Sequence, residues 1–124
     1  MKVGTAKAAA ELLAPLFEAS EQEIVAVAHL DAGQRLLEVS VEEKGAGGEV
    51  ALPVRAILTR ALKLDAHAII VAHNHPSGDP TPSEADREAT RRLAEAAAAV
   101  DVRLHDHLIF AGGECRSFRA LGLL

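Results

Sequence analysis

The strongest constraint on the fold is the unbroken apolar run at residues 68–72, Ala-Ile-Ile-Val-Ala. A strand with one face in water alternates apolar and polar residues, so a short run without polar side chains is typical of a central strand buried on both faces. The segment before it begins at Pro53 and repeats apolar residues at helical spacing, namely Val54, Ile57, Leu58, Ala61 and Leu62. These neighbouring patterns predict a sheet with helices packed against it.

A β-hairpin is predicted in the first half of the chain. Residues 24–30 form an apolar run, residues 31–34 supply turn residues, and residues 36–41 resume an extended pattern. The glycine-rich residues 45–48 then end the second strand. Before the hairpin, residues 6–16 carry leucines on one side and predict a short helix that packs on the sheet.

The second half of the chain predicts a long helix between two strands. Thr81 as N-cap, Pro82 at the first helical position and Glu84 form a capping box, and the helix is expected to continue to about residue 100. Residues 104–110 predict the next strand, which is followed by a Gly-Gly turn and a short final strand.

The order of these elements predicts a single α/β domain, a mixed sheet with helices packed on it, over residues 1–124. A chain of 124 residues that is 49% apolar is long enough for one buried core. No apolar run approaches the roughly 20 residues of a membrane span, and no signal peptide is recognisable, so a cytoplasmic protein is expected. The single cysteine, Cys115, excludes an internal disulfide.

The charge balance argues against a nucleic-acid partner. The formal net charge is −5, and Lys and Arg form no concentrated patch of the kind that binds phosphate backbones. With no Trp or Tyr and only three Phe, the chain also offers few side chains for base stacking. Neither direct nucleic-acid binding nor a membrane partner is expected.

Four residues after the apolar run carry the candidate chemistry. His73 and His75 are two apart at the end of the predicted strand, so their side chains point to the same side and can converge on one metal ion. Ser83 and Asp86 are three apart on the next helix, hence on one face. Asp86 is therefore a candidate third ligand, with Ser83 beside it. Three protein ligands leave a fourth zinc position open, as in catalytic sites.

The same residues also fit purely structural roles. Two histidines at a strand end can simply hydrogen-bond a loop. Ser83 with Asp86 also fits a second capping box, in which Ser83 is the N-cap. This box competes with the one formed by Thr81 and Glu84 for the same helix end, so one of the two pairs is free for other work.

The spacing of these four residues resembles that of a known family. His73, His75, seven intervening residues, Ser83, two more and Asp86 match the H-x-H-x7-S-x2-D signature of the JAMM (JAB/MPN+) zinc metalloproteases. The wider string at residues 72–86, with the segments at 106–109 and 117–118, is similar to the bacterial RadC subfamily. The resemblance covers the chain from about residue 21 to its end.

The resemblance implies an MPN-type fold, similar to that of cytidine deaminases, with a zinc ion held by His73, His75 and Asp86. A water in the fourth position would attack an amide carbonyl, and Ser83 would stabilise the developing oxyanion. The implied substrate is a peptide or an isopeptide-linked protein. RadC-like proteins commonly carry a helical region before this domain, and the chain is expected to lack it.

The family's general base is a glutamate on an earlier strand, and here the sequence departs from the pattern. A register anchored on residues 30–31 and 35–36 puts Ser40 in that position, and a serine hydroxyl does not accept a proton near neutral pH. Glu38 and Glu42 lie on the same strand face, one side-chain pair to either side. A bulge or a shift in register can bring either to the site. Glu38 is the preferred candidate, because Glu42 adjoins the glycine-rich break.

Two interpretations of function follow. The first is a zinc-dependent hydrolase with Glu38 or Glu42 as its base. The second is a metal-binding MPN module that has lost hydrolysis with the glutamate and serves as an interaction domain. A second metal at His105 and His107 is not expected, because no further carboxylate or thiolate falls at ligand spacing. His107 is instead expected to form a supporting hydrogen bond.

Overall fold

A five-stranded mixed sheet forms the centre of the molecule in the computed structural model, which describes residues 1–43 and 52–124. The strands lie in the spatial order β2-β1-β3-β4-β5. Their bounds are β1 (Ile24–Leu30), β2 (Leu36–Glu43), β3 (Ala68–Asn74), β4 (Arg103–Ala111) and β5 (Glu114–Ser117). β3 and β4 pair in parallel, and the other neighbours pair antiparallel. The predicted α/β domain with a mixed sheet is confirmed, whereas the predicted break at residues 45–48 lies outside the described residues.

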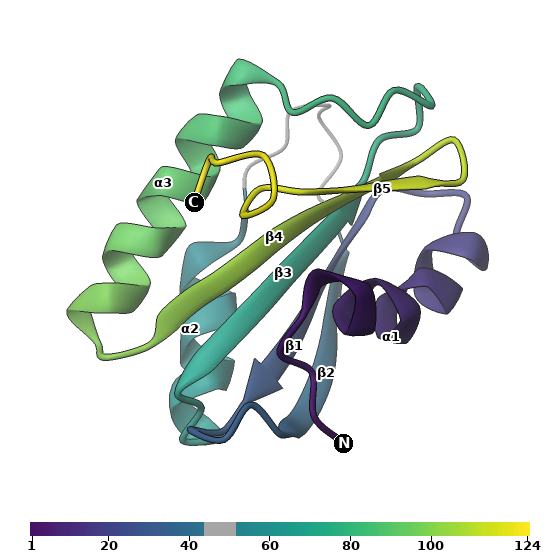
Figure 1. Ribbon diagram of the computed structural model, residues 1–124. Helices are drawn as coiled ribbons and strands as arrows, with labels where there is room; N and C mark the ends of the chain where they lie inside the picture. Colours follow the sequence, from purple (N-terminus) through teal and green to yellow (C-terminus); the bar gives the residue numbers. More distant parts are fainter. Residues whose placement is uncertain (44–51) are drawn as a thin grey trace.

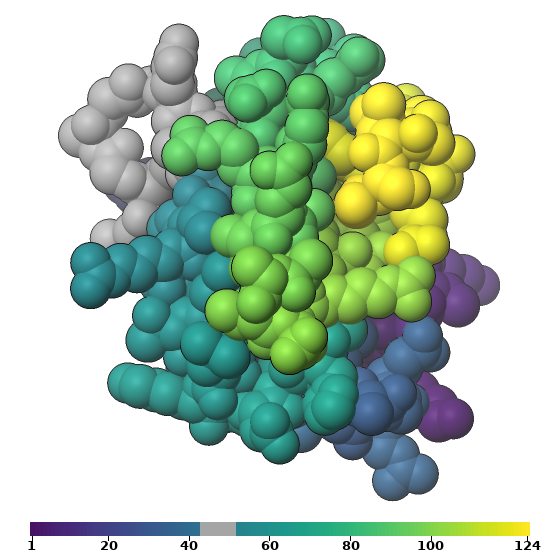
Figure 2. Space-filling model, turned by 90° about the vertical axis from the view of Figure 1, so that its left-hand side faces the viewer, coloured from purple at the N-terminus to yellow at the C-terminus, as the bar shows by residue number. Residues whose placement is uncertain are grey.

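β3 lies in the middle of the sheet, as its composition predicts. Its residues 69–73 are all buried, because strands flank it on both edges and helices cover both faces. α1 (Ala6–Glu18) covers one face, and α2 (Val54–Lys63) and α3 (Glu84–Ala99) cover the other (Figure 1). Figure 2 shows α3 along the middle of the second face, with the C-terminal segment beside it. No helix in the described parts of the chain is both long and apolar enough to cross a membrane.

Each face of the sheet has its own apolar core, and the residues of β3 alternate between the two. Ile69 and Val71 pack with α2 and α3, and Ile70 and Ala72 pack with α1. The same alternation turns His73 toward the face of α2 and α3 and Asn74 toward the face of α1. A histidine at the end of this strand is thus directed at the start of α3.

The start of α3 differs from the prediction. The helix begins at Glu84 with Ser83 as its N-cap, so the prediction of Thr81 as N-cap is wrong. The backbone N–H of Thr81 is instead bound by Asp79 Oδ1 at 2.9 Å, which keeps Thr81 in the loop after β3. The capping box that forms is the competing one between Ser83 and Asp86.

Asp106 on β4 ties down the segment that follows β5. Its buried carboxylate accepts hydrogen bonds from Ser117 Oγ at 2.6 Å, from the His107 backbone N–H at 2.7 Å and from the Arg119 backbone N–H at 3.1 Å. Phe118, held between the anchored residues, is fully buried against the sheet. One carboxylate therefore joins the C-terminal segment to the strand that carries His107.

Replacing Asp106 by Ala is expected to lower the free energy of unfolding by about 2 kcal/mol or more, because buried donors lose their acceptor. Urea denaturation measures this change. The control Glu95→Ala, at an exposed position of α3, is expected to stay within about 0.5 kcal/mol of the wild type. Equal stability of the two variants would contradict the anchoring role of Asp106.

Candidate metal centre

Three potential metal ligands meet where β3 ends and α3 begins. His73 is the second-to-last residue of β3, His75 follows the strand, and Asp86 lies in the first turn of α3. His73 Nε2 and His75 Nε2 are 3.0 Å apart, and they lie 3.3 and 3.0 Å from the two carboxylate oxygens of Asp86. The structure thus brings together the three residues that the sequence singles out, with one ligand atom from each within 4.8 Å of the others.

The capping box positions the carboxylate of Asp86. Ser83 Oγ accepts a hydrogen bond from the Asp86 N–H at 3.0 Å, and Asp86 Oδ2 accepts one from the Ser83 N–H at 2.8 Å. Asp86 Oδ1 is buried and receives no hydrogen bond. The capping role and the ligand role are therefore compatible, since the box leaves one carboxylate oxygen free.

Asp86 is held in its charged form. Burial by itself would raise the pKa of this carboxyl group, but hydrogen bonding, including the bond from the Ser83 backbone N–H, outweighs burial and holds the pKa well below its usual range. A buried carboxylate with an unsatisfied oxygen requires a positive charge nearby.

A backbone carbonyl determines which nitrogen of His75 carries the proton. His75 Nδ1 lies 2.8 Å from the carbonyl oxygen of Asp79. Because a carbonyl oxygen can only accept, Nδ1 is the donor. In the neutral ring, Nε2 then presents a lone pair toward Asp86 and His73.

A buried relay determines the tautomer of His73 in the same way. Thr90 Oγ1 lies 2.6 Å from the carbonyl oxygen of Asp86 and 2.6 Å from His107 Nδ1. The hydroxyl has one proton and the carbonyl must receive it, so His107 Nδ1 donates to Thr90 Oγ1. His107 Nε2 therefore accepts from His73 Nδ1, which is 2.7 Å away. His73 Nε2 is left with a free lone pair.

His107 is suited to this relay because it stays neutral. Burial, together with the adjacent His73, holds the pKa of His107 well below its usual value. Its ring stacks on Phe118, with the centroids 4.5 Å apart and the planes 19° apart. The expectation that His107 forms a supporting hydrogen bond is confirmed.

When both rings are neutral, three electron-rich atoms consequently face one another without a proton between them. They are His73 Nε2, His75 Nε2 and the carboxylate of Asp86, and they repel one another unless a cation lies among them. Two imidazole nitrogens and one carboxylate are the protein ligands of many catalytic zinc sites. The residues present therefore fit a metal ion, with hydrogen bonds behind both histidines to hold the rings in place.

Ser83 stands beside this centre with its side chain partly committed. Its Oγ accepts a hydrogen bond from Asp86, so the hydroxyl proton remains available for donation. Ser83 is exposed, whereas Asp86 is buried. The hydroxyl is thus accessible to a molecule that approaches the metal centre from solvent.

The strand register orders the three candidates on β2 by their distance from the metal centre. Glu42 is paired with Val25, and Val25 is paired in turn with His73. Ser40 lies two residues further along β2 and Glu38 four, which sets Glu38 about 13 Å from the row of His73 along the strand. Directly paired residues point to the same face, so Glu42 and His73 share one face across β1.

Ser40 and Glu38 are engaged elsewhere. Ser40 Oγ is hydrogen-bonded to Nε2 of the buried His29 at 3.0 Å. Glu38 forms a two-pronged ion pair with Arg60 of α2, and this hydrogen bonding lowers the pKa of Glu38. The structure therefore does not bring Glu38 to the histidines.

Thr90 is a site residue that the sequence patterns did not reveal. It lies one helical turn after Asp86, in a buried stripe of α3 that continues with Leu93 and Ala97. A polar residue in this otherwise apolar stripe was the available signal. It pointed to a buried hydrogen bond but named no partner, because His107 lies on another element.

Comparisons with known proteins agree with this geometry. The family described as the RadC-like JAB domain matches residues 3–123. A UPF0758 protein of Symbiobacterium thermophilum is 40% identical over 95% of the chain and 50% of its own length. Another, from Coxiella burnetii, is 41% identical over 99% of the chain and 55% of its own length. The chain thus spans about half the length of these curated relatives.

Thr90→Val is expected to lower zinc affinity by about 10- to 100-fold, since His107 loses the acceptor that orients it and, through it, His73. Competition with a chromogenic chelator measures the affinity. Thr90→Ser keeps the hydroxyl and is expected to bind zinc within about threefold of the wild type. If the valine variant, shown to be folded by circular dichroism, binds as tightly as the serine variant, the relay does not support the metal centre.

Proposed function

The chain belongs to the RadC-like JAB domain family, and from that premise we propose that it is a zinc-dependent hydrolase that cleaves an amide bond in a peptide or an isopeptide-linked protein. The observation that carries the proposal is the convergence of three lone pairs from His73, His75 and Asp86. Bound zinc would lower the pKa of a coordinated water toward neutrality and so supply a nucleophile. Proton transfer and stabilisation of the oxyanion would be carried out by side chains around the centre.

Glu42 is the general base in this proposal. It aligns with His73 through Val25 and shares its face of the sheet, whereas Glu38 is paired with Arg60. The Glu42 carboxylate would accept the proton released by the attacking water and deliver it to the leaving amine. Ser40, one side-chain pair away, cannot do so because its hydroxyl does not accept a proton near neutral pH.

Ser83 would stabilise the negative charge that develops on the carbonyl oxygen. Its oxygen accepts the Asp86 backbone N–H in the capping box, and the hydroxyl proton can still turn toward a substrate oxygen. The N-cap position holds the hydroxyl on a rigid helix start, next to the ligand Asp86. A donor fixed in advance contributes more to catalysis than one that must reorient.

The second candidate is a metal-binding module that recognises other proteins without hydrolysing them. The contact between Ser40 and His29 favours it, because the residue in the family's base position serves a structural hydrogen bond here. The two candidates differ in one property, which is whether Glu42 supports turnover.

The deciding experiment measures cleavage of a library of linear and lysine-branched peptides by mass spectrometry. We expect the wild type to cleave, a chelator to abolish cleavage and added zinc to restore it. Glu42→Gln is expected to lower kcat by about 100-fold or more while zinc stays bound. The control Glu38→Gln is expected to change kcat less than about twofold. Wild-type protein with zinc bound and no cleavage would support the binding module instead.

Ser83→Ala is expected to lower kcat by about 100-fold, the effect of removing one oxyanion donor. The same change removes the N-cap and is expected to lower the free energy of unfolding by about 1 kcal/mol. Ser83→Thr keeps a hydroxyl and should largely preserve both quantities. An alanine variant that loses stability but keeps full kcat would restrict Ser83 to capping.

A further inference from the structure

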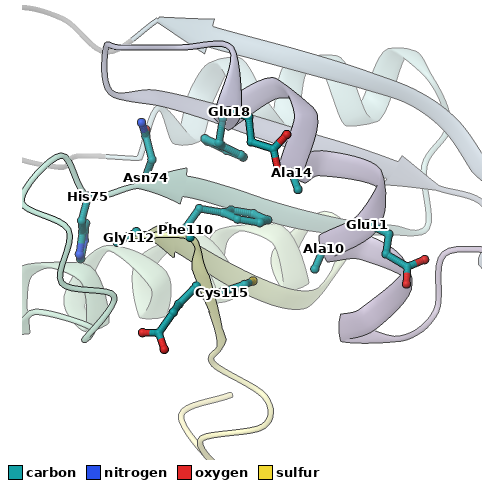
Figure 3. Close-up of a pocket in the computed structure, with 13 residues that line it drawn as sticks. Ala10, Glu11, Ala14, Glu18, Asn74, His75, Phe110, Gly112 and Cys115 are labelled. Atoms are coloured by element: carbon teal, nitrogen blue, oxygen red, sulfur yellow. The ribbon is translucent and has the colours of Figure 1, made fainter.

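A groove on the opposite face of the sheet reaches the candidate metal centre through His75. It has a volume of about 450 Å³ and runs between α1 and the hairpin formed by β4 and β5. His75 and Asn74 lie at one end, Glu11 and Ala10 lie at the other, and the ring of Phe110 lies between them (Figure 3). The His75 side chain is 15% exposed, so a molecule in the groove can touch a proposed metal ligand directly.

The floor of the groove is apolar and firmly held. Phe110 stacks on Phe17 of α1, with the ring centroids 4.7 Å apart. Cys115 is paired with Phe110 across the hairpin and points to the same face. Burial, together with Asp106, raises the pKa of the Cys115 thiol to about 11, so the group stays uncharged near neutral pH. This floor suits an apolar side chain.

The end of the groove near His75 is also fixed in place. Asn74 accepts a hydrogen bond from the Ile24 N–H at 2.9 Å and donates one to the Gln22 carbonyl at 3.1 Å. Gly112 has a φ of 58°, and a Cβ there would lie 2.8 Å from the Gly78 carbonyl oxygen. The hairpin turn therefore packs closely on the loop that carries His75, and this contact fixes the position of the groove relative to the candidate metal centre.

The rim of the groove is acidic. Besides the uncharged Cys115 thiol, its ionisable side chains are Glu11 and Glu18 on α1, Glu114 on β5 and His75, and neither Lys nor Arg is among its lining residues. All three glutamates are exposed, and because Glu114 is ion-paired with Arg116 at 3.1 Å, the acidic character of the rim rests on Glu11 and Glu18. Because the chain carries a formal net charge of −5, a second copy of itself would be a poor electrostatic match. A partner with positive charge on either side of an apolar residue fits the groove.

We propose that this groove binds an extended peptide segment in which an apolar side chain is flanked by lysine or arginine. The apolar side chain would lie on Phe110 and Cys115, and the basic residues would face Glu11 and Glu18. β5 is one of the two edge strands of the sheet, so it offers main-chain groups to an extended segment. The inference rests on the proposed function, because it makes the segment part of the substrate beside the bond that is cleaved.

The test uses the whole chain with Asp86→Asn, which should prevent turnover, and short fluorescent peptides. One peptide carries leucine between lysines, the second leucine between glutamates, and the third alanine between lysines. Fluorescence anisotropy is expected to show the first binding about tenfold more tightly than either of the others, and its affinity should fall with added salt. Addition of the first peptide should shift the backbone nuclear magnetic resonance signals of Phe110 and Cys115. Equal binding of all three peptides, or shifts confined to another surface, would overturn the proposal.

Groove variants locate the binding determinants. The double variant Glu11→Gln with Glu18→Gln should weaken binding of the lysine-leucine peptide about three- to tenfold, and Ala14→Leu should block the groove. The control Glu88→Gln, at an exposed position of α3, should leave binding unchanged. An effect of the control equal to that of the double variant would overturn the assignment.

The proposed peptide binding and the proposed hydrolase activity can be disproved separately. Selective peptide binding by a chain whose wild type cleaves no amide would retain the groove and remove the proposed activity. Cleavage by the wild type that shows no preference for basic residues, and does not change in the Glu11 and Glu18 double variant, would retain the activity and remove the groove.

Discussion

Two backbone carbonyl oxygens determine the tautomers of both histidines in the candidate metal centre. The carbonyl of Asp79 faces His75 Nδ1, and the carbonyl of Asp86 faces the Thr90 hydroxyl. Because a carbonyl oxygen can only accept a hydrogen bond, the group that faces it, His75 Nδ1 or the Thr90 hydroxyl, must donate its proton. The consequence passes from Thr90 through His107 to His73, and it leaves lone pairs on both histidines directed at one carboxylate. The arrangement of the three candidate ligands thus depends on hydrogen bonds to residues behind them.

Folding and ligand geometry share the same residues at the start of α3. The bonds that cap the helix also hold the carboxylate of Asp86 against the histidines, and the carbonyl of Asp86 anchors the relay. The unsatisfied Asp86 Oδ1 weakens the metal-free fold, because a buried anion lacks part of its compensation. A metal that binds only the folded chain would add about 2.7 kcal/mol of stability at a concentration of 100 times its Kd.

The sequence predicts much of the fold and the ligand set, because those features depend on local patterns. The apolar run identifies β3, the spacing of His73 and His75 puts both rings at its end, and helical spacing puts Asp86 near Ser83. The choice between Thr81 and Ser83 as N-cap could not be predicted in this way, since it depends on the loop residue Asp79, whose side chain binds the Thr81 backbone N–H. The order of Glu38 and Glu42 depended on strand register, which links β2 to β3 only through β1. Thr90 and the α1 groove depend on contacts between elements far apart in the chain, for which one sequence carries no direct signal.

We propose that His73, His75 and Asp86 together hold one zinc ion. X-ray absorption at the zinc edge, combined with elemental analysis of wild-type protein purified without chelators, tests it most directly. We expect one zinc per chain, two nitrogen ligands at about 2.0–2.1 Å and oxygen in the remaining positions. We also expect loss of this signal in His75→Ala. A wild-type chain that holds no stoichiometric metal and takes up no zinc would show that these residues do not form a zinc site.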